Sequence, residues 1–222
     1  MKIIYDDDFL VVAEKPFGVI SQNSNDNNNM VFLLSNELNC EIFPVHRLDR
    51  ETGGVMVFAK DAHTAAILSR QITEHALKKE YIALAHNEVT PNSAELCDLL
   101  FRDAKANKSY VVKRERRGVK KAVLSYEKCG CIDTKYGLIS ILKIKLKTGR
   151  THQIRVQFSS RGHSLLGDRR YGGRDDARIL GLWSYKLGFI HPKTNKFVEF
   201  ISLPENNEIF TKEILEKFNI TN

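Results

Sequence analysis

A carboxylate stands between two arginines in the first quarter of the chain, where residues 44–54 read Pro-Val-His-Arg-Leu-Asp-Arg-Glu-Thr-Gly-Gly. Arg47 and Arg50 would keep the Asp49 carboxyl ionised, because nearby positive charge favours the charged form. An ionised carboxylate can act as a nucleophile. The glycine pair that follows allows another backbone to approach closely. The spacing by itself is equally compatible with a surface turn that contains an ordinary ion pair.

A second polar cluster lies about two thirds of the way along the chain. Residues 147–157 read Lys-Thr-Gly-Arg-Thr-His-Gln-Ile-Arg-Val-Gln, and residues 162–172 read Gly-His-Ser-Leu-Leu-Gly-Asp-Arg-Arg-Tyr-Gly. The density of Arg, His and Gln exceeds what a core or a plain turn requires. On a helix, Arg155 would lie one turn from Thr151 and His152, and its planar fork would suit a buried carboxylate or a phosphate.

Periodic apolar patterns predict the elements that must position these segments. Strands are expected at residues 3–5, 10–14, 54–59, 79–85, 109–113, 121–129, 138–147, 179–190 and 196–201. Helices are expected at residues 30–38, after a cap at Asp61, within residues 149–162 and at 210–218. The pattern of residues 149–162 is compatible with a strand or a helix. We favour a helix, with the cap near Thr151, Ile154 and Phe158 on the inner face and the stop at Gly162.

The order of these elements indicates the fold class. Strands outnumber helices and do not alternate with them regularly, which predicts an α+β fold with a mixed, mostly antiparallel sheet core flanked by helices and loops. A chain of 222 residues fits one domain, so residues 1–222 are expected to form a single catalytic domain.

Positive charge is concentrated in two segments. The net charge is +7, yet residues 102–121 hold nine basic and two acidic side chains, and residues 140–174 hold nine basic and one acidic. The other residues carry 16 basic and 24 acidic side chains. Two basic segments on an otherwise acidic chain favour a face that binds a polyanion, with nucleic acid as the expected partner.

The sequence lacks the motifs that metal, nucleotide-cofactor and membrane binding require. Cys129-Gly130-Cys131 is too closely spaced for a structural zinc site, and the seven His show no metal-binding spacing. No glycine-rich phosphate loop or dinucleotide-binding pattern is present, so we expect no metal and no cofactor. No apolar run is long enough to span a bilayer, and the start does not resemble a secretory signal, so we expect no membrane partner and a cytoplasmic location.

Three motifs, in chain order, resemble those of the RluA-type pseudouridine synthases. The segment around Asp49 resembles His-Arg-Leu-Asp-x-x-Thr-Ser-Gly, with Gly53 in place of Ser. Residues 148–155 resemble Thr-Gly-Arg-x-His-Gln-Ile-Arg, and residues 164–172 resemble Pro-Leu-Leu-Gly-Asp-x-x-Tyr-Gly, with Ser164 in place of Pro. Residues 79–83 and 9–18 are similar to the family's tyrosine-bearing strand and to its start. The resemblance begins near residue 1, so we expect a pseudouridine synthase fold without an S4-type RNA-binding domain.

The resemblance implies an isomerase that converts uridine in RNA to pseudouridine. Asp49 would be the nucleophile, with attack at C6 of the base or C1′ of the ribose left open. Arg155 would pair with Asp49 and hold it ionised and aimed. Tyr81 would stack on the flipped uracil and lie near the sugar for proton removal.

The remaining implied roles concern binding. Leu166 would form the apolar wall opposite Tyr81, and Arg47 would fill the space that the flipped base leaves in the RNA. Arg150 and His152 would contact phosphate or support the site. The substrate would be a structured ribosomal or transfer RNA, and we expect the protein to be a monomer.

Two other functions are compatible with the basic composition. A metal-independent ribonuclease could use a histidine pair such as His46 and His152 as general acid and base. That reading leaves Asp49, Tyr81 and Arg155 unexplained. A non-catalytic RNA-binding domain would not need Asp49 and Arg155. Analysis of the RNA product separates the three functions, as isomerised, cleaved or unchanged RNA.

Overall fold

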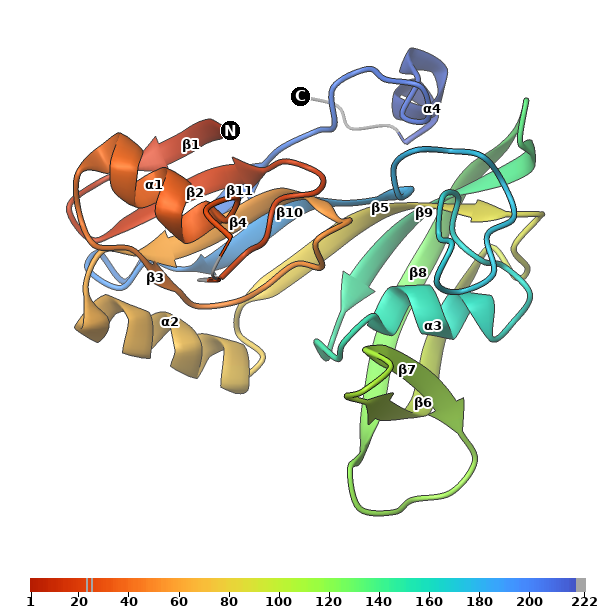
Figure 1. Ribbon diagram of the computed structural model, residues 1–222, viewed down its shortest axis with the longest axis horizontal. Coiled ribbons are helices and arrows are strands. Elements are labelled where there is room, and N and C mark those ends of the chain that lie inside the picture. The colour runs from red at the N-terminus through yellow and green to blue at the C-terminus, as the bar shows by residue number, and fades with distance from the viewer. Residues whose placement is uncertain (23, 25, 219–222) are drawn as a thin grey trace. The chain divides into compact units, whose positions relative to one another are not determined.

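The computed structural model describes residues 1–22, 24 and 26–218 (Figure 1). The chain forms two compact units. Unit 1 comprises Met1–Lys79 and Trp183–Pro204, and unit 2 comprises Glu80–Leu182 and Glu205–Asn222. The expectation of one domain over residues 1–222 stays a prediction.

Unit 1 is built on a sheet with the strand order β1-β2-β4-β10-β11, and β3 also pairs with β4. The strands are β1 (Lys2–Asp6), β2 (Leu10–Lys15), β3 (Phe43–Pro44), β4 (Gly53–Ala59), β10 (Leu182–Ile190) and β11 (Phe197–Ile201). The β4–β10 pair is parallel, and the other pairs are antiparallel. The two helices are α1 (Met30–Leu38) and α2 (Ala62–Thr73).

The core of unit 1 follows from the apolar patterns. All seven residues of β4 are buried. Leu68 of α2 packs with apolar side chains of β2, β4 and β10, among them Leu10, Val57 and Phe189. The Asp61 side chain accepts a hydrogen bond from the backbone N of Thr64, so it caps α2 as predicted. The central position of β4 matters because the Asp49 segment leads directly into it.

Unit 2 is an antiparallel sheet with the strand order β5-β9-β8-β6-β7. Its strands are β5 (Lys78–His86), β6 (Ser93–Asp103), β7 (Lys108–Val112), β8 (Val119–Thr134) and β9 (Gly137–Leu146). Its helices are α3 (Gln153–Ser159) and α4 (Lys212–Lys217). In β9, Ile144 is buried and Lys145 is exposed, so the strand has one apolar and one basic face.

The first basic segment forms an arm at one end of unit 2. Residues 102–121, which we call the basic arm, contain the end of β6, the turn, β7, the next loop and the start of β8 (Figure 1). Strand β7 pairs with β6 at one edge of the sheet.

The predicted fold class is confirmed, and several element boundaries differ from those expected. Strand β6 was not predicted, because its eleven residues alternate poorly between apolar and polar. Helix α3 begins at Gln153, and its N-cap is His152 in the left-handed region (φ 53°), one residue after Thr151 and without a side-chain cap hydrogen bond. Thr151 and His152 therefore precede the helix instead of lying one turn from Arg155 on it. Ile154 and Phe158 are buried as predicted.

Candidate active site

Asp49 lies in a tight turn just before β4. The backbone N of Thr52 donates to the backbone O of Asp49 at 3.0 Å. Leu48 is buried and fixes the start of the turn, while Arg47 is exposed and Asp49 is half-buried. Ser21 Oγ donates to the Leu48 carbonyl and accepts from the Leu48 backbone N. The turn thus presents a carboxylate on rigid backbone, with the Arg47 side chain available to solvent.

Lys15, at the end of β2, binds the same turn through its ammonium group. Its Nζ donates to the carbonyls of Pro16, Val19 and Arg50 at 2.9, 2.7 and 3.2 Å. Burial lowers the pKa of Lys15 to about 7, and the charge of Asp49 opposes that shift. Three carbonyls match the three donors of an ammonium group. Lys15 therefore ties the residue after Asp49 to the opening segment of the chain, a role that sequence reasoning missed.

The glycine pair gives β4 its close neighbour. A Cβ on Gly54, whose φ is +120°, would lie 2.2 Å from the backbone O of Ser184. A Cβ on Gly53 would lie 2.3 Å from the ring of Trp183. The expected close approach of another backbone is confirmed, and that backbone is β10. Gly53, where the related motif has Ser, leaves the room that Trp183 fills.

Arg155 is held on α3 by a buried carboxylate. Its Nε and Nη2 each donate to an oxygen of Asp168 at 2.8 Å, and both residues are almost fully buried. Such a two-pronged, charge-assisted pair fixes the plane of the guanidinium. The sequence predicted a carboxylate partner but did not identify Asp168. The expected pairing of Arg155 with Asp49 would join residues of different units and stays a prediction.

His152 and Tyr171 support this pair. The Tyr171 hydroxyl lies 2.9 Å from Nδ1 of His152 and accepts a hydrogen bond from the backbone N of Ser109 at 2.7 Å. The Tyr171 ring lies against the guanidinium of Arg155, 5.4 Å from its centre. His152 is 8% exposed, which favours the supporting role over phosphate contact. Its left-handed backbone is uncommon for a residue with a side chain and is the kind of strain found at functional sites.

Tyr81 and Leu166 are fixed by strand β5. Tyr81 is buried and pairs with Ile144 across the β5–β9 ladder. The backbone N of Leu166 donates to the carbonyl of Leu84 at 2.8 Å, so the loop that bears Leu166 adds to the same strand. Unit 2 therefore positions Tyr81, Leu166, Arg155 and His152, and unit 1 positions Asp49 and Arg47.

The nine cations of the basic arm outnumber its two acidic side chains. In the part of the chain that the structure describes, none of the nine forms an ion pair. In the second basic segment, by contrast, Lys145, Lys147, Arg155 and Arg161 each pair with an acidic side chain. Arg150 connects the two segments, because its Nε donates to the Lys121 carbonyl at 3.0 Å. Within the described residues, the arm therefore has more cations without an ion pair than the second segment.

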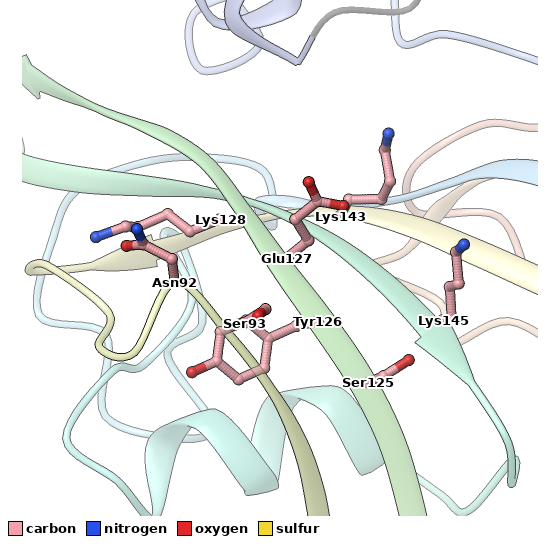
Figure 2. Close-up of a pocket in the computed structure, with 8 residues that line it drawn as sticks. All are labelled: Asn92, Ser93, Ser125, Tyr126, Glu127, Lys128, Lys143 and Lys145. Carbon is pink, nitrogen blue, oxygen red and sulfur yellow. The ribbon is translucent and has the colours of Figure 1, made fainter.

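A hollow of about 510 Å³ in unit 2 is formed by other residues. It is lined by Asn92, Ser93, Ser125, Tyr126, Glu127, Lys128, Lys143 and Lys145 (Figure 2). Two of its lysines have acidic partners, because Lys128 pairs with Glu88 and Lys145 lies 3.9 Å from Glu80. Glu127 and Lys143 are register partners in the β8–β9 ladder. None of the predicted site residues lines it.

Over the described residues, no group of three or more His, Cys, Asp or Glu side chains could hold a metal ion. Among the same residues, no helix has both the length and the apolar character needed to cross a membrane.

Comparison with known proteins identifies the family. The family model described as RNA pseudouridylate synthase matches residues 9–160, which contain the Asp49 turn, Tyr81 and Arg155. This chain belongs to the RNA pseudouridylate synthase family. The family predicted from the sequence is confirmed, and so is the class of enzyme, a pseudouridine synthase, that the family comprises.

Two curated pseudouridine synthases illustrate the similarity. The chain is 33% identical to the ribosomal large subunit pseudouridine synthase C of Buchnera aphidicola from Schizaphis graminum, over 90% of this chain and 66% of that protein. It is 30% identical to the tRNA pseudouridine synthase C of Haemophilus ducreyi, over 87% of each chain. The chain thus spans about two thirds of the ribosomal relative and most of the tRNA relative.

A solved structure supports the fold. Human RNA Pseudouridylate Synthase Domain Containing 1 matches 91% of this chain and 83% of its own, with a TM-score of 0.77 and 22% identity. At that identity the match shows a shared pseudouridine synthase fold.

Proposed function

We propose that this protein isomerises uridine to pseudouridine in structured RNA, with Asp49 as the nucleophile. The observation that carries the proposal is the family match across residues 9–160, in which Asp49 stands on a rigid turn between two arginines. Incubation of the purified protein with candidate RNAs, followed by mapping of pseudouridine, tests it. RNA that is cleaved or unchanged would contradict it.

The reaction exchanges one bond to the ribose for another. The C1′–N1 bond breaks, the uracil rotates, C5 bonds to C1′, and the proton on C5 is lost while N1 gains one. No redox equivalent and no energy input is required, so the side chains need only hold charge and move a proton. The target base must first leave its stack, at a cost of a few kcal/mol. Arg47, exposed two residues before Asp49, suits the vacated position in the RNA.

Tyr81→Phe tests whether the Tyr81 hydroxyl takes part in proton removal. We expect RNA affinity to stay within about twofold and the single-turnover rate to fall roughly 10²-fold, the scale of a positioned acid–base group. Stacking alone would leave the rate near normal, because it needs only the ring. Quench-flow at saturating RNA measures the rate.

Tyr126→Phe is the matched control for that experiment. Tyr81 and Tyr126 pair with opposite sides of the same residue, Ile144, and both are 5% exposed. The Tyr126 hydroxyl donates to the Pro91 carbonyl at 2.9 Å. Its loss should lower the melting temperature slightly and leave the rate unchanged. A folded Tyr81→Leu variant with the normal rate would remove Tyr81 from the site.

The basic arm supplies the surface for the RNA backbone. Lys113, Arg114, Arg116 and Arg117 are exposed, and their charges are not offset by acidic partners within the described residues. The Arg116 guanidinium also lies over the Phe101 ring, 4.7 Å from its centre. This contact holds the Arg116 side chain along the hairpin. Cations free of acidic partners can release counterions when they meet phosphates.

Replacing these four cations by Gln should weaken RNA binding and flatten its salt dependence. Each lost phosphate contact should lower the slope of log K against log salt by roughly 0.7–0.9. Filter binding from low to high salt measures the slope. A matched control compares two double variants. Replacing Lys113 and Arg114 by Gln should lower the slope. Replacing Lys193 and Lys196, which are exposed in unit 1 outside both basic segments, by Gln should leave the slope unchanged. An unchanged slope in the four-fold variant would place the arm away from RNA.

We further propose that the reaction requires no metal ion. The chemistry above needs no Lewis acid, and Arg155 supplies fixed positive charge. Activity should therefore persist in excess EDTA on an RNA that stays folded without divalent ions. Loss of activity that zinc alone restores would overturn this and implicate the cysteines.

The ribonuclease alternative is weakened by the environment of His46. Burial, assisted by the charge of Lys79, holds the pKa of His46 well below its usual range. Its Nε2 accepts a hydrogen bond from the backbone N of Val57 at 3.1 Å. A neutral, enclosed imidazole cannot exchange protons with an RNA ribose, so His46 does not suit general acid–base cleavage.

The physiological substrate is a ribosomal or a transfer RNA. The relatives' names include both ribosomal large subunit and tRNA pseudouridine synthases, which supports either RNA as the substrate. We propose a monomer acting in the cytoplasm, where such RNAs are found. Pseudouridine mapping in cells with and without the protein identifies the target, and sedimentation identifies the oligomeric state.

A further inference from the structure

Residues 168–171 contact both the basic arm and Arg155. At one end, Asp168 holds Arg155 through two hydrogen bonds of 2.8 Å. At the other end, Arg170 Nη1 donates to the carbonyls of Ala106 and Asn107, each at 3.2 Å, in the turn of the basic arm. Four consecutive residues therefore contact both the arm and the arginine of the active site.

Tyr171 is the centre of this connection. Its hydroxyl accepts a hydrogen bond from the backbone N of Ser109 in β7, and Ser109 Oγ donates to the Thr151 carbonyl at 2.7 Å. Its backbone N donates to Asp168 Oδ1 at 3.2 Å, and its ring lies against the Arg155 guanidinium. Burial raises the pKa of the Tyr171 hydroxyl, so the group stays protonated.

The edge strand makes the connection specific to the arm. Strand β7 has its ladder partner β6 on one side only, and the backbone N of Ser109 meets the Tyr171 hydroxyl instead of another strand. Lys108, the neighbouring cation, lies 5.2 Å from the centre of the Tyr171 ring. A shift of β7 on binding RNA would therefore move the Tyr171 ring, and with it the Asp168–Arg155 pair.

We propose that Tyr171 is a positioning residue that couples RNA binding by the basic arm to the orientation of Arg155. The inference rests on the proposed function. Phosphate contacts along the arm fix β7, β7 fixes Tyr171 through Ser109, and Tyr171 fixes Asp168 and Arg155. The arm then contributes to the rate of the chemical step as well as to affinity.

Tyr171→Phe, combined with arm neutralisation, tests the coupling in a double-mutant cycle. The variant keeps the ring against Arg155 and removes only the hydroxyl. At saturating RNA we expect its single-turnover rate to fall roughly 10- to 100-fold, the scale of a small misplacement of a catalytic group, with affinity within about twofold. In the wild type, Lys113→Gln with Arg114→Gln should also lower the saturated rate. In the Tyr171→Phe background the same pair should lower affinity only.

Controls separate coupling from a loss of structure. Tyr126→Phe removes a buried tyrosine hydroxyl from the same unit and should leave the saturated rate and its dependence on the arm as in the wild type. If Tyr171→Phe does not fold, Arg170→Gln breaks the exposed contact to the arm turn and takes its place in the cycle. A normal rate in the folded variant, or an arm effect that stays fully additive, would overturn the proposal.

Hydrogen exchange makes the test independent of turnover. RNA binding should increase amide protection in α3 of the wild type and of Tyr126→Phe, but not of Tyr171→Phe. Equal protection in all three would overturn the coupling. A wild type that binds RNA, shows this protection and converts no uridine would contradict the proposed function and leave the coupling intact.

Discussion

Asp49→Asn should abolish isomerisation while RNA binding survives. The amide has nearly the size of the carboxylate, but it carries no charge and cannot form the covalent bond to the substrate. We expect the single-turnover rate to fall on the order of 10⁴-fold or more, the scale seen when a covalent nucleophile is removed. The turn itself should persist. The hydrogen bonds that Thr52, Ser21 and Lys15 donate to backbone carbonyls of the turn do not use the Asp49 side chain.

The control for this variant is Asp8→Asn, which removes an exposed carboxylate from the same unit. It makes the same change of charge and should leave both rate and affinity unchanged. Affinity is measured by filter binding, and product by pseudouridine mapping at long times. Substantial turnover by the Asp49→Asn protein would end the assignment of Asp49 as the nucleophile.

Arg155→Lys should be severely impaired although the positive charge is kept. The guanidinium makes two parallel bonds to Asp168, and an ammonium on a flexible stem cannot reproduce that plane. One buried oxygen of Asp168 would lose its partner, which destabilises the folded state as well as displacing the charge. We expect a loss of roughly 10²-fold in single-turnover rate, together with a lower melting temperature.

Arg161→Lys provides a close comparison. Arg161 lies just after α3 and also makes two bonds to a carboxylate, at 2.9 and 3.1 Å to Asp98, but its side chain is 36% exposed. Exposed ion pairs contribute about 0–1 kcal/mol, so this variant should be nearly silent. Near-normal activity of Arg155→Lys would mean that Arg155 supplies only positive potential.

Local physics explains why much of the fold could be predicted from the sequence. Apolar side chains at fixed spacing predicted β4, α2 and β9, because these patterns depend only on neighbouring residues. Turn and cap chemistry likewise predicted the Asp61 cap and the glycine pair. Strand β6 was missed because its polar positions, such as Glu95 and Asp98, find partners in distant segments.

The candidate site divides along the same line. The sequence by itself determined the family, the position of Asp49 between two arginines, and the selection of Arg155 and Tyr81 as candidate site residues. Motifs and their order along the chain can be read without a structure. Only the tertiary structure decided that Asp168 holds Arg155, that Lys15 anchors the Asp49 turn, and that Tyr171 reaches Ser109. The partners lie 13 positions apart for Arg155 and Asp168, 35 for Lys15 and Arg50, and 62 for Ser109 and Tyr171. No local pattern specifies such partners, because a buried charge or hydroxyl is satisfied by whichever group the packed fold brings within hydrogen-bonding distance.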